Sequence, residues 1–198
     1  QIYTQFWLGF CYLDQARQTN NAALFDKAGE HFQKRLELAE KLNDDQSIEE
    51  QIYAQAWLGF CYFEQALQNN EATLFNKALK HFQEQLACAE QLDDDMGIER
   101  QADAQTWLGR CYLKQAKQNQ DNIKKNKDFL SKAKQLFDES SKLAEQIKDE
   151  NLKKQTLENI TRDFRELDFV KGDYEGYFKS KQEHIQQKLP ENIRGCTR

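Results

Sequence analysis

A six-residue motif occurs three times in this chain, each copy fifty residues after the previous one. The copies begin at Trp7, Trp57 and Trp107 and read WLGFCY, WLGFCY and WLGRCY. A fixed period in this range is typical of stacked structural units, each of which buries its apolar face only against a neighbour. We therefore expect an elongated array built by the addition of similar units. Most such arrays are binding surfaces without chemistry of their own.

The composition favours helices along the whole chain. The 198 residues include one proline and eight glycines, the two residue types that weaken a helix most. No apolar run approaches the length of a membrane span, and no signal peptide opens the chain, so we expect no membrane association. The chain starts at Gln1, the counterpart of Gln51, without a methionine. We therefore expect it to be a piece of a longer array.

Apolar residues recur at steps of three and four through each unit, which predicts two amphipathic helices per unit. The expected helices of the first three units cover about 2–19, 22–42, 47–67, 71–92, 97–117 and 129–147. Ser47 and Glu50 have the spacing of a capping box at the start of the third helix. The lysine-rich stretch 119–128 has no apolar period and is predicted to be a long loop.

A degenerate fourth pair is expected after the third unit, with a turn at Gly172-Asp173-Tyr174 between its helices. Terminal repeats are often atypical because one of their faces meets water. The expected fold is an all-α, right-handed α-solenoid of four antiparallel helix pairs in one domain, residues 1–189. Its units are expected at about 1–46, 47–96, 97–148 and 149–189, with a flexible tail at 190–198.

Three residue types recur inside the motif and are expected to make helix contacts. A glycine in mid-helix costs ~1 kcal/mol relative to alanine, so Gly59 and its counterparts predict the close approach of a partner helix. Trp57 is predicted to lie in the core between adjacent units. Cys11, Cys61 and Cys111 are expected to be buried as small apolar groups, since the chain has no CxxC pair for a metal. Reduced thiols and no export signal favour a cytoplasmic location.

The motif, read as Leu-Gly-x-x-Tyr and followed by a helix of small and aromatic residues, resembles the tetratricopeptide (TPR) repeat. The resemblance is close over 1–147 and loose over 150–188. The chain departs from the family in its period, fifty residues here against 34, and in its tryptophan, which directly precedes the leucine. Long-period relatives occur in the sensor arms of large signalling ATPases and beside caspase-like protease domains.

The resemblance implies that the first helix of each unit lines a concave face that binds a protein or peptide. The candidate binding residues run from aromatic to basic: Tyr3, Phe6, Phe10, Tyr53, Phe60, Phe63, Arg110, Lys114 and Lys117. Asp103 falls at the inward position equivalent to Tyr53. This gradient predicts a partner with an apolar end and an acidic end. The alternative is that the aromatic residues only pack neighbouring helices together.

No pattern in the sequence points to catalysis, a cofactor or a metal. His31 and His81 are repeat-equivalent beside Phe32 and Phe82, which indicates a structural role. Residues 1–100 carry 8 Lys and Arg against 17 Asp and Glu, a balance of −9, whereas residues 101–198 carry 20 against 16, or +4. An acidic first half does not favour a continuous nucleic-acid track.

The sequence therefore predicts a non-catalytic protein- or peptide-binding scaffold. The alternative function is a sensor or regulatory arm of a larger signalling ATPase or caspase-like protease whose catalytic domain lies outside this chain.

Overall fold

A computed structural model of the chain describes residues 1–42, 46–119 and 122–188, and these ranges contain seven helices and no strand. The helices are α1 (Ile2–Thr19), α2 (Ala22–Ala39), α3 (Gln46–Asn69), α4 (Ala72–Ala89), α5 (Asp95–Gln118), α6 (Ile123–Ala144) and α7 (Glu150–Lys188). None of the helices in the described ranges is long and apolar enough to cross a membrane. The all-helical prediction is confirmed.

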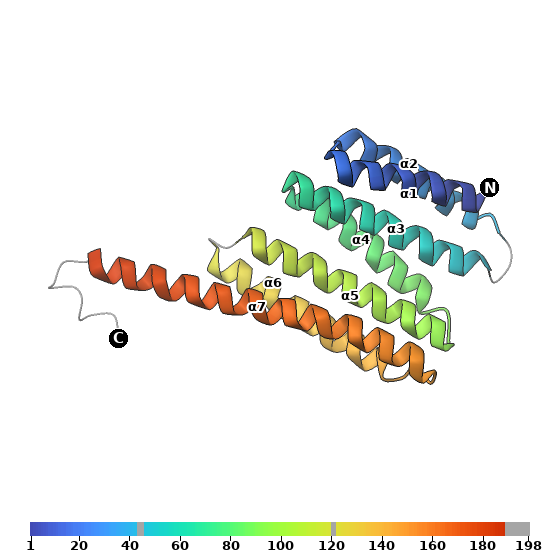
Figure 1. The fold of residues 1–198 in the computed structure, drawn as a ribbon. Helices are drawn as coiled ribbons and strands as arrows, with labels where there is room; N and C mark the ends of the chain where they lie inside the picture. Colours follow the sequence, from blue (N-terminus) through green and yellow to red (C-terminus); the bar gives the residue numbers. More distant parts are fainter. Residues whose placement is uncertain (43–45, 120–121, 189–198) are drawn as a thin grey trace.

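The helices form two layers (Figure 1). The odd-numbered helices lie side by side in one layer, here called the odd-helix layer, and α2, α4 and α6 lie behind it. Neighbouring odd-numbered helices contact one another directly, whereas each even-numbered helix, over the described ranges, contacts only the odd-numbered helices on either side. Neighbouring helices are therefore closer together in the odd-helix layer than in the layer behind it.

The helices of a unit run in opposite directions, as the contacts between α5 and α6 show. From the start of α5 to its end, Thr106 meets Ser140, Gly109 meets Phe137, and the Ala116 carbonyl accepts a hydrogen bond from Asn126. The loops between paired helices are short, and Asn20 and Asn70 take the left-handed conformation that ends α1 and α3.

The recurrent glycine makes room for a phenyl ring of the paired helix. A Cβ atom on Gly59 would lie 2.6 Å from Cε1 of Phe82, far inside the ordinary separation of non-bonded carbons. Gly9 faces Phe32 in the same way, and Gly109 faces Phe137. The predicted close helix approach is therefore confirmed.

The same phenyl ring also packs on the tryptophan of the next unit. Phe32 stacks on Trp57 with ring centroids 5.7 Å apart and an interplanar angle of 26°. Phe82 stacks on Trp107 at 5.5 Å and 14°. Trp57 lies between units as predicted, but it is only partly buried against the core formed by α1, α2 and α3 and is not itself a core residue.

The last contact of this series differs, because α7 has no tryptophan. Phe164 takes its place, with its ring centroid 5.7 Å from that of Phe137. Ile160 and Leu167, from the predicted apolar stripe of the fourth unit, are 2% and 1% exposed beside it. The first half of α7 is thus the first helix of a fourth unit.

The predicted fourth helix pair is wrong, because α7 is one continuous helix from Glu150 to Lys188. Gly172 lies inside it and has no positive φ, so the expected turn at Gly172-Asp173 does not form. A glycine weakens a helix without ending it, and α7 contains no proline. The chain therefore forms three helix pairs and a long single helix over the described residues. The predicted tail at 190–198 lies outside those residues.

Two predicted details of helix starts are also wrong. Ser47 and Glu50 form no capping box: the Ser47 hydroxyl donates to the Ala39 carbonyl at 2.9 Å, and Glu50 accepts hydrogen bonds from Arg35. The stretch 119–128 is not all loop, because α6 starts at residue 123 with the Asn122 side chain as its cap. Lysine is a good helix former, so a lysine-rich turn needs no apolar period.

The structure corrects the prediction for one of the three repeated cysteines. Cys61 and Cys111 are 2% and 0% exposed, and the Cys61 thiol donates to the Phe25 carbonyl at 3.4 Å. Cys11 is exposed. The helix that covers Cys61 belongs to the preceding unit, and no helix of the described chain occupies that position over Cys11.

We predict opposite effects for two glycine-to-alanine substitutions. Gly59→Ala gains helix propensity but forces a clash with Phe82, so it should destabilise the protein by about 1–3 kcal/mol. The control is Gly29→Ala in α2, where an added Cβ meets nothing within 4 Å, and it should stabilise by up to about 1 kcal/mol. Urea denaturation followed by circular dichroism measures both. Equal midpoints for the two variants would contradict the steric interpretation.

Thiol labelling should separate the repeated cysteines by burial. Burial raises the pKa of the Cys61 thiol to about 12 and also raises that of Cys111, so neither forms much thiolate at pH 8. Cys11 should therefore react first with iodoacetamide, and the other two only when the protein unfolds. Peptide mapping by mass spectrometry measures each site, with urea-unfolded protein as the control. Native labelling of Cys61 at the rate of Cys11 would show that the helix contact is absent.

Candidate functional site

Two adjoining cavities lie on the odd-helix layer and share the side chains of Asp103 and Trp107. The larger, about 300 Å³, lies between α3 and α5, and the smaller, about 180 Å³, lies between α5 and α7. The two together are here called the central pocket. The larger cavity is lined by Tyr53, Ala56, Trp57, Phe60, Arg100, Asp103 and Trp107. The smaller adds Glu99, Thr106, Arg110, Thr156, Asn159 and Ile160.

The walls of the larger cavity come from equivalent positions of two units. Tyr53, Trp57 and Phe60 follow one another at steps of four and three, so they lie on one face of α3. Fifty residues later, the same positions of α5 hold Asp103, Trp107 and Arg110. The repeat thus places an aromatic wall opposite a polar one, a difference that comes from two substitutions between the units.

A buried ion pair lies next to the aromatic wall. Arg35 of α2 is 4% exposed, and its Nε and Nη2 atoms donate to one carboxylate oxygen of Glu50 at 3.0 and 2.7 Å. Its guanidinium also lies 5.0 Å from the ring centroid of Phe6 and 5.5 Å from that of Tyr53. These contacts tie α2 to α3 and hold Tyr53 in place.

The two arginines that line the central pocket have carboxylate partners of their own. Arg100 lies 3.1 Å from Glu99 and donates to the Tyr53 hydroxyl at 2.8 Å. Arg110 binds Asp163 through two hydrogen bonds of 2.8 and 2.9 Å. Both positive charges are therefore balanced by neighbours within the chain.

Asp103 is the carboxylate of the pocket that lacks such a partner. Its Oδ2 accepts a hydrogen bond from the Gln85 amide at 3.2 Å, and within the described ranges no cationic group lies within 4 Å of it. Burial raises the pKa of Asp103, although the Gln85 hydrogen bond and the more distant charges of Arg110 and Arg100 partly offset this effect. When Asp103 is ionised, the central pocket therefore holds one negative charge in excess.

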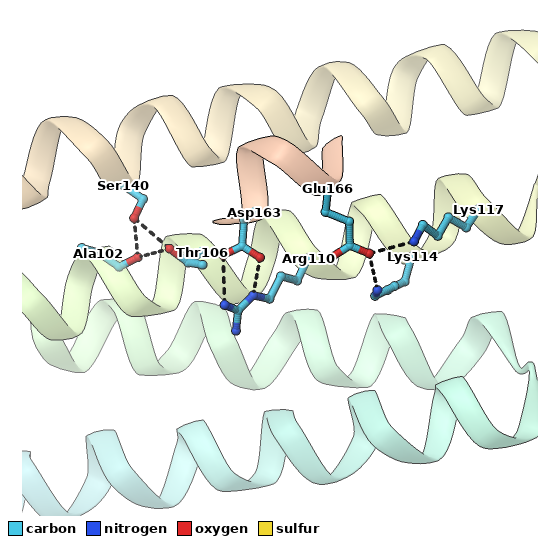
Figure 2. Close-up of polar contacts among 8 residues, drawn as sticks. All are labelled: Ala102, Thr106, Arg110, Lys114, Lys117, Ser140, Asp163 and Glu166. Atoms are coloured by element: carbon cyan, nitrogen blue, oxygen red, sulfur yellow. Dashed lines mark hydrogen bonds and ion pairs between the residues drawn. The ribbon is translucent and has the colours of Figure 1, made fainter. Parts of the chain in front are cut away.

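The three predicted basic residues all bind α7 (Figure 2). Besides the Arg110–Asp163 pair, Lys114 and Lys117 both donate to Oε1 of Glu166, at 2.6 and 2.7 Å. Burial alone would raise the pKa of Glu166, but the two ammonium groups lower it overall. The basic end of the predicted gradient is thus occupied by acidic side chains of the same chain.

The predicted aromatic residues divide into three groups by exposure. Phe63 is 4% exposed, between Phe75 and Trp107, and offers no surface to a partner. Phe6, Tyr53 and Phe60 are partly buried, and the last two line the central pocket. Tyr3 and Phe10 are 68% and 39% exposed at the start of the array. Of the six predicted aromatic residues, only Phe63 is fully used in packing between helices.

His31 and His81 have the structural role that the sequence predicts. The Nδ1 atom of His81 lies 2.8 Å from Oε1 of Gln55, and the imidazole stacks on Tyr62 at 5.4 Å. Burial, with the nearby charge of Lys80, lowers the pKa of His81 to about 4, so the ring is neutral at pH 7. His31 makes the equivalent contacts with Gln5 and Tyr12.

Sequence reasoning missed Asp103 and Glu99 as site residues. Asp103 stood among the inward positions, but its importance lies in having no cationic partner, which depends on contacts that the sequence does not state. Its substitution for the tyrosine of the preceding unit was the available signal.

No protein-family model matches the chain, and the comparison with curated proteins gives no match. Among solved structures, the "DHF58 filament" is similar with 12% identity and a TM-score of 0.44, covering 95% of this chain and 97% of its own. The "Crystal structure of de novo designed helical repeat protein DHR64" is similar with 14% identity and a TM-score of 0.44, covering 90% of this chain and 96% of its own. Both likenesses are too distant to add to what the chain itself shows. By its sequence period and its packing, this chain is a helical repeat protein.

The ion pair that joins α5 to α7 should contribute more to stability than an exposed pair elsewhere in the chain. Asp163 is 5% exposed, and Asp163→Ala leaves Arg110 without its two hydrogen bonds. The free energy of unfolding should therefore fall by about 1–3 kcal/mol. The control is Asp128→Ala, which removes an exposed pair with Lys132 in α6 and should cost no more than about 0.5 kcal/mol. Thermal melts at low and high salt compare the two. An equal loss in both variants would mean that the Arg110 pair does not anchor α7.

Proposed function

We propose that this chain is a non-catalytic scaffold that binds a protein or peptide segment on the odd-helix layer, with the central pocket as its anchor point. The observation that carries this function is the combination, in one hollow, of an aromatic wall and a carboxylate that has no cationic partner among the described residues. Apolar surface fixed beside a few polar groups is the usual composition of a binding site.

The aromatic wall supports an apolar anchor in the partner. Trp57 and Phe60 are held by ring contacts inside the array, for example Phe60 against Trp107 at 5.2 Å, and the Tyr53 ring lies against the guanidinium groups of Arg35 and Arg100. A wall that is already ordered loses little entropy on binding. A cavity of about 300 Å³ accommodates one or two side chains, so a short segment of the partner is the unit that docks.

The charge of the pocket favours a basic group next to that anchor. The cations expected to bind an acidic end, Arg110, Lys114 and Lys117, are paired with α7. Asp103 has no cation of the described chain to pair with. A lysine or arginine of the partner supplies one and donates a charge-assisted hydrogen bond to its carboxylate. The proposed partner thus keeps the apolar end predicted from sequence and has a positive group in place of the acidic one.

We further propose that the units follow the right-handed TPR-like arrangement, in which first helices line the concave face. The Leu-Gly-x-x-Tyr motif and the narrower spacing of the odd-helix layer support this arrangement.

Selection from a phage-displayed random peptide library tests the function without a known partner. Peptides that bind the chain should combine an aromatic or leucine residue with a nearby lysine or arginine. Ala56→Trp fills the cavity from a partly exposed position of α3 and should weaken them at least about tenfold, equivalent to ~1.4 kcal/mol. Asp128→Asn, on α6, is the control and should leave binding unchanged. Peptides that bind Ala56→Trp as tightly as the original chain would overturn the proposed site.

The pH dependence of binding should identify the carboxylate. A peptide with a basic group needs ionised Asp103, and burial raises the pKa of this residue. Affinity should therefore be constant near pH 8 and fall as the pH drops, beginning at a higher pH than for an ordinary aspartate with a pKa near ~4. Asp103→Asn should bind several-fold more weakly at pH 8 and show no such fall. Fluorescence anisotropy of a selected peptide measures both. An unchanged pH profile in Asp103→Asn would assign the titration to another group.

A further inference from the structure

One face of α1 exposes a continuous set of apolar side chains. Tyr3, Trp7, Leu8 and Phe10 are 68%, 60%, 40% and 39% exposed, and Cys11 is exposed beside them. These five residues are here called the α1 face. Large apolar groups gathered on a surface mark an interaction site more often than scattered ones do.

The repeat shows what covers this face in the rest of the molecule. Leu58 and Cys61, the counterparts of Leu8 and Cys11, are both 2% exposed under α2. Trp57, the counterpart of Trp7, stacks on Phe32 of the same helix. The residues that are exposed on α1 are therefore covered by a helix at the equivalent positions of the next unit.

The third unit repeats this arrangement. Leu108 and Cys111 are 5% and 0% exposed against α4, and Trp107 stacks on Phe82. Two of the three copies of the motif are thus covered by the second helix of the preceding unit. The copy on α1 has the same residues, and over the described ranges it has no such helix.

We infer that the α1 face is an interface for the second helix of a further unit of this repeat, packed as α2 packs on α3. The chemistry of that helix follows from the contacts of Trp57, Leu58 and Cys61, of which the first two recur at Trp107 and Leu108. It presents a phenylalanine to stack on Trp7, small and apolar residues over Leu8, and a backbone carbonyl that accepts the Cys11 thiol.

Among the residues that the structure describes, a second copy of this chain does not offer that helix. In the described structure, α2, α4 and α6 each lie between two odd-numbered helices, so their apolar stripes are already covered. The hollow on the exposed surface of α7 is lined mainly by polar and charged groups such as Lys153, Glu158, Arg162 and Arg165. Neither surface matches the α1 face, and a further unit is the occupant that does.

Adding such a unit tests the inference. Residues 1–50 are fused directly before residue 1, which reproduces the junction between Glu50 and Gln51. The added copy carries Cys11→Ser and Trp7→Phe, so that the added unit contributes no thiol and no tryptophan of its own. Peptide mapping should show that labelling of the original Cys11 slows at least tenfold, to the rate of Cys61, and the summed tryptophan emission should shift to shorter wavelength as Trp7 becomes covered.

Placing the same fifty residues after residue 198 is the matched control, since the last turns of α7 lie far from α1 (Figure 1), and Cys11 should stay reactive there. Cys11 that remains reactive in the upstream fusion, while helical content rises by the added unit, would overturn the inference. Failure of the added unit to fold would also overturn it, if a second version made from residues 51–100 stays unfolded too. Protection of Cys11 in the unfused chain that grows with its concentration would identify a second copy as the occupant and equally reject it.

Discussion

The contact of one phenyl ring with a glycine on one helix and a tryptophan on another holds this molecule together. Phe82 fits against Gly59 of its own unit and stacks on Trp107 of the next. Every unit is thereby joined to its neighbour through the residue that also closes its own helix pair. Stability of this kind is a sum over neighbours. The contact of the phenyl ring with the glycine and the tryptophan also sets the distances between helices, and with them the width of the central pocket.

Much of this fold follows from the sequence, because the repeated motif fixes both the core and its period. The glycine, the tryptophan and the first six helices are readable from spacing alone. The fourth unit is not, because its motif has decayed and Gly172 looks the same in a helix as in a turn. The exposure of Cys11 could not be predicted for a different reason. Its motif is identical to that of Cys61 and predicts the same burial, but the helix that buries Cys61 belongs to the preceding unit.

The candidate site was less predictable, because a binding surface depends on which charges remain unpaired. Arg110 and Lys114 follow an inward-facing pattern, yet their partners lie more than fifty residues away in the decayed unit. No periodicity reveals such pairs. Asp103 shows the converse: it differs from the tyrosine of the preceding unit by one substitution, and its chemical meaning depends on the Gln85 amide and the absence of a nearby cation among the described residues.

The buried pair between Arg35 and Glu50 has a consequence for how the units find their order. Neighbouring repeats with near-identical cores are prone to misassembly, in which one unit is skipped and the next takes its place. If α2 packed on α5 with the second unit looped out, Arg35 would meet Arg100, the counterpart of Glu50. Two like charges would then face each other in a dry interface, which strongly disfavours the skipped arrangement. The apolar core makes the units alike, and this one pair distinguishes the correct junction of the first two units from the skipped one.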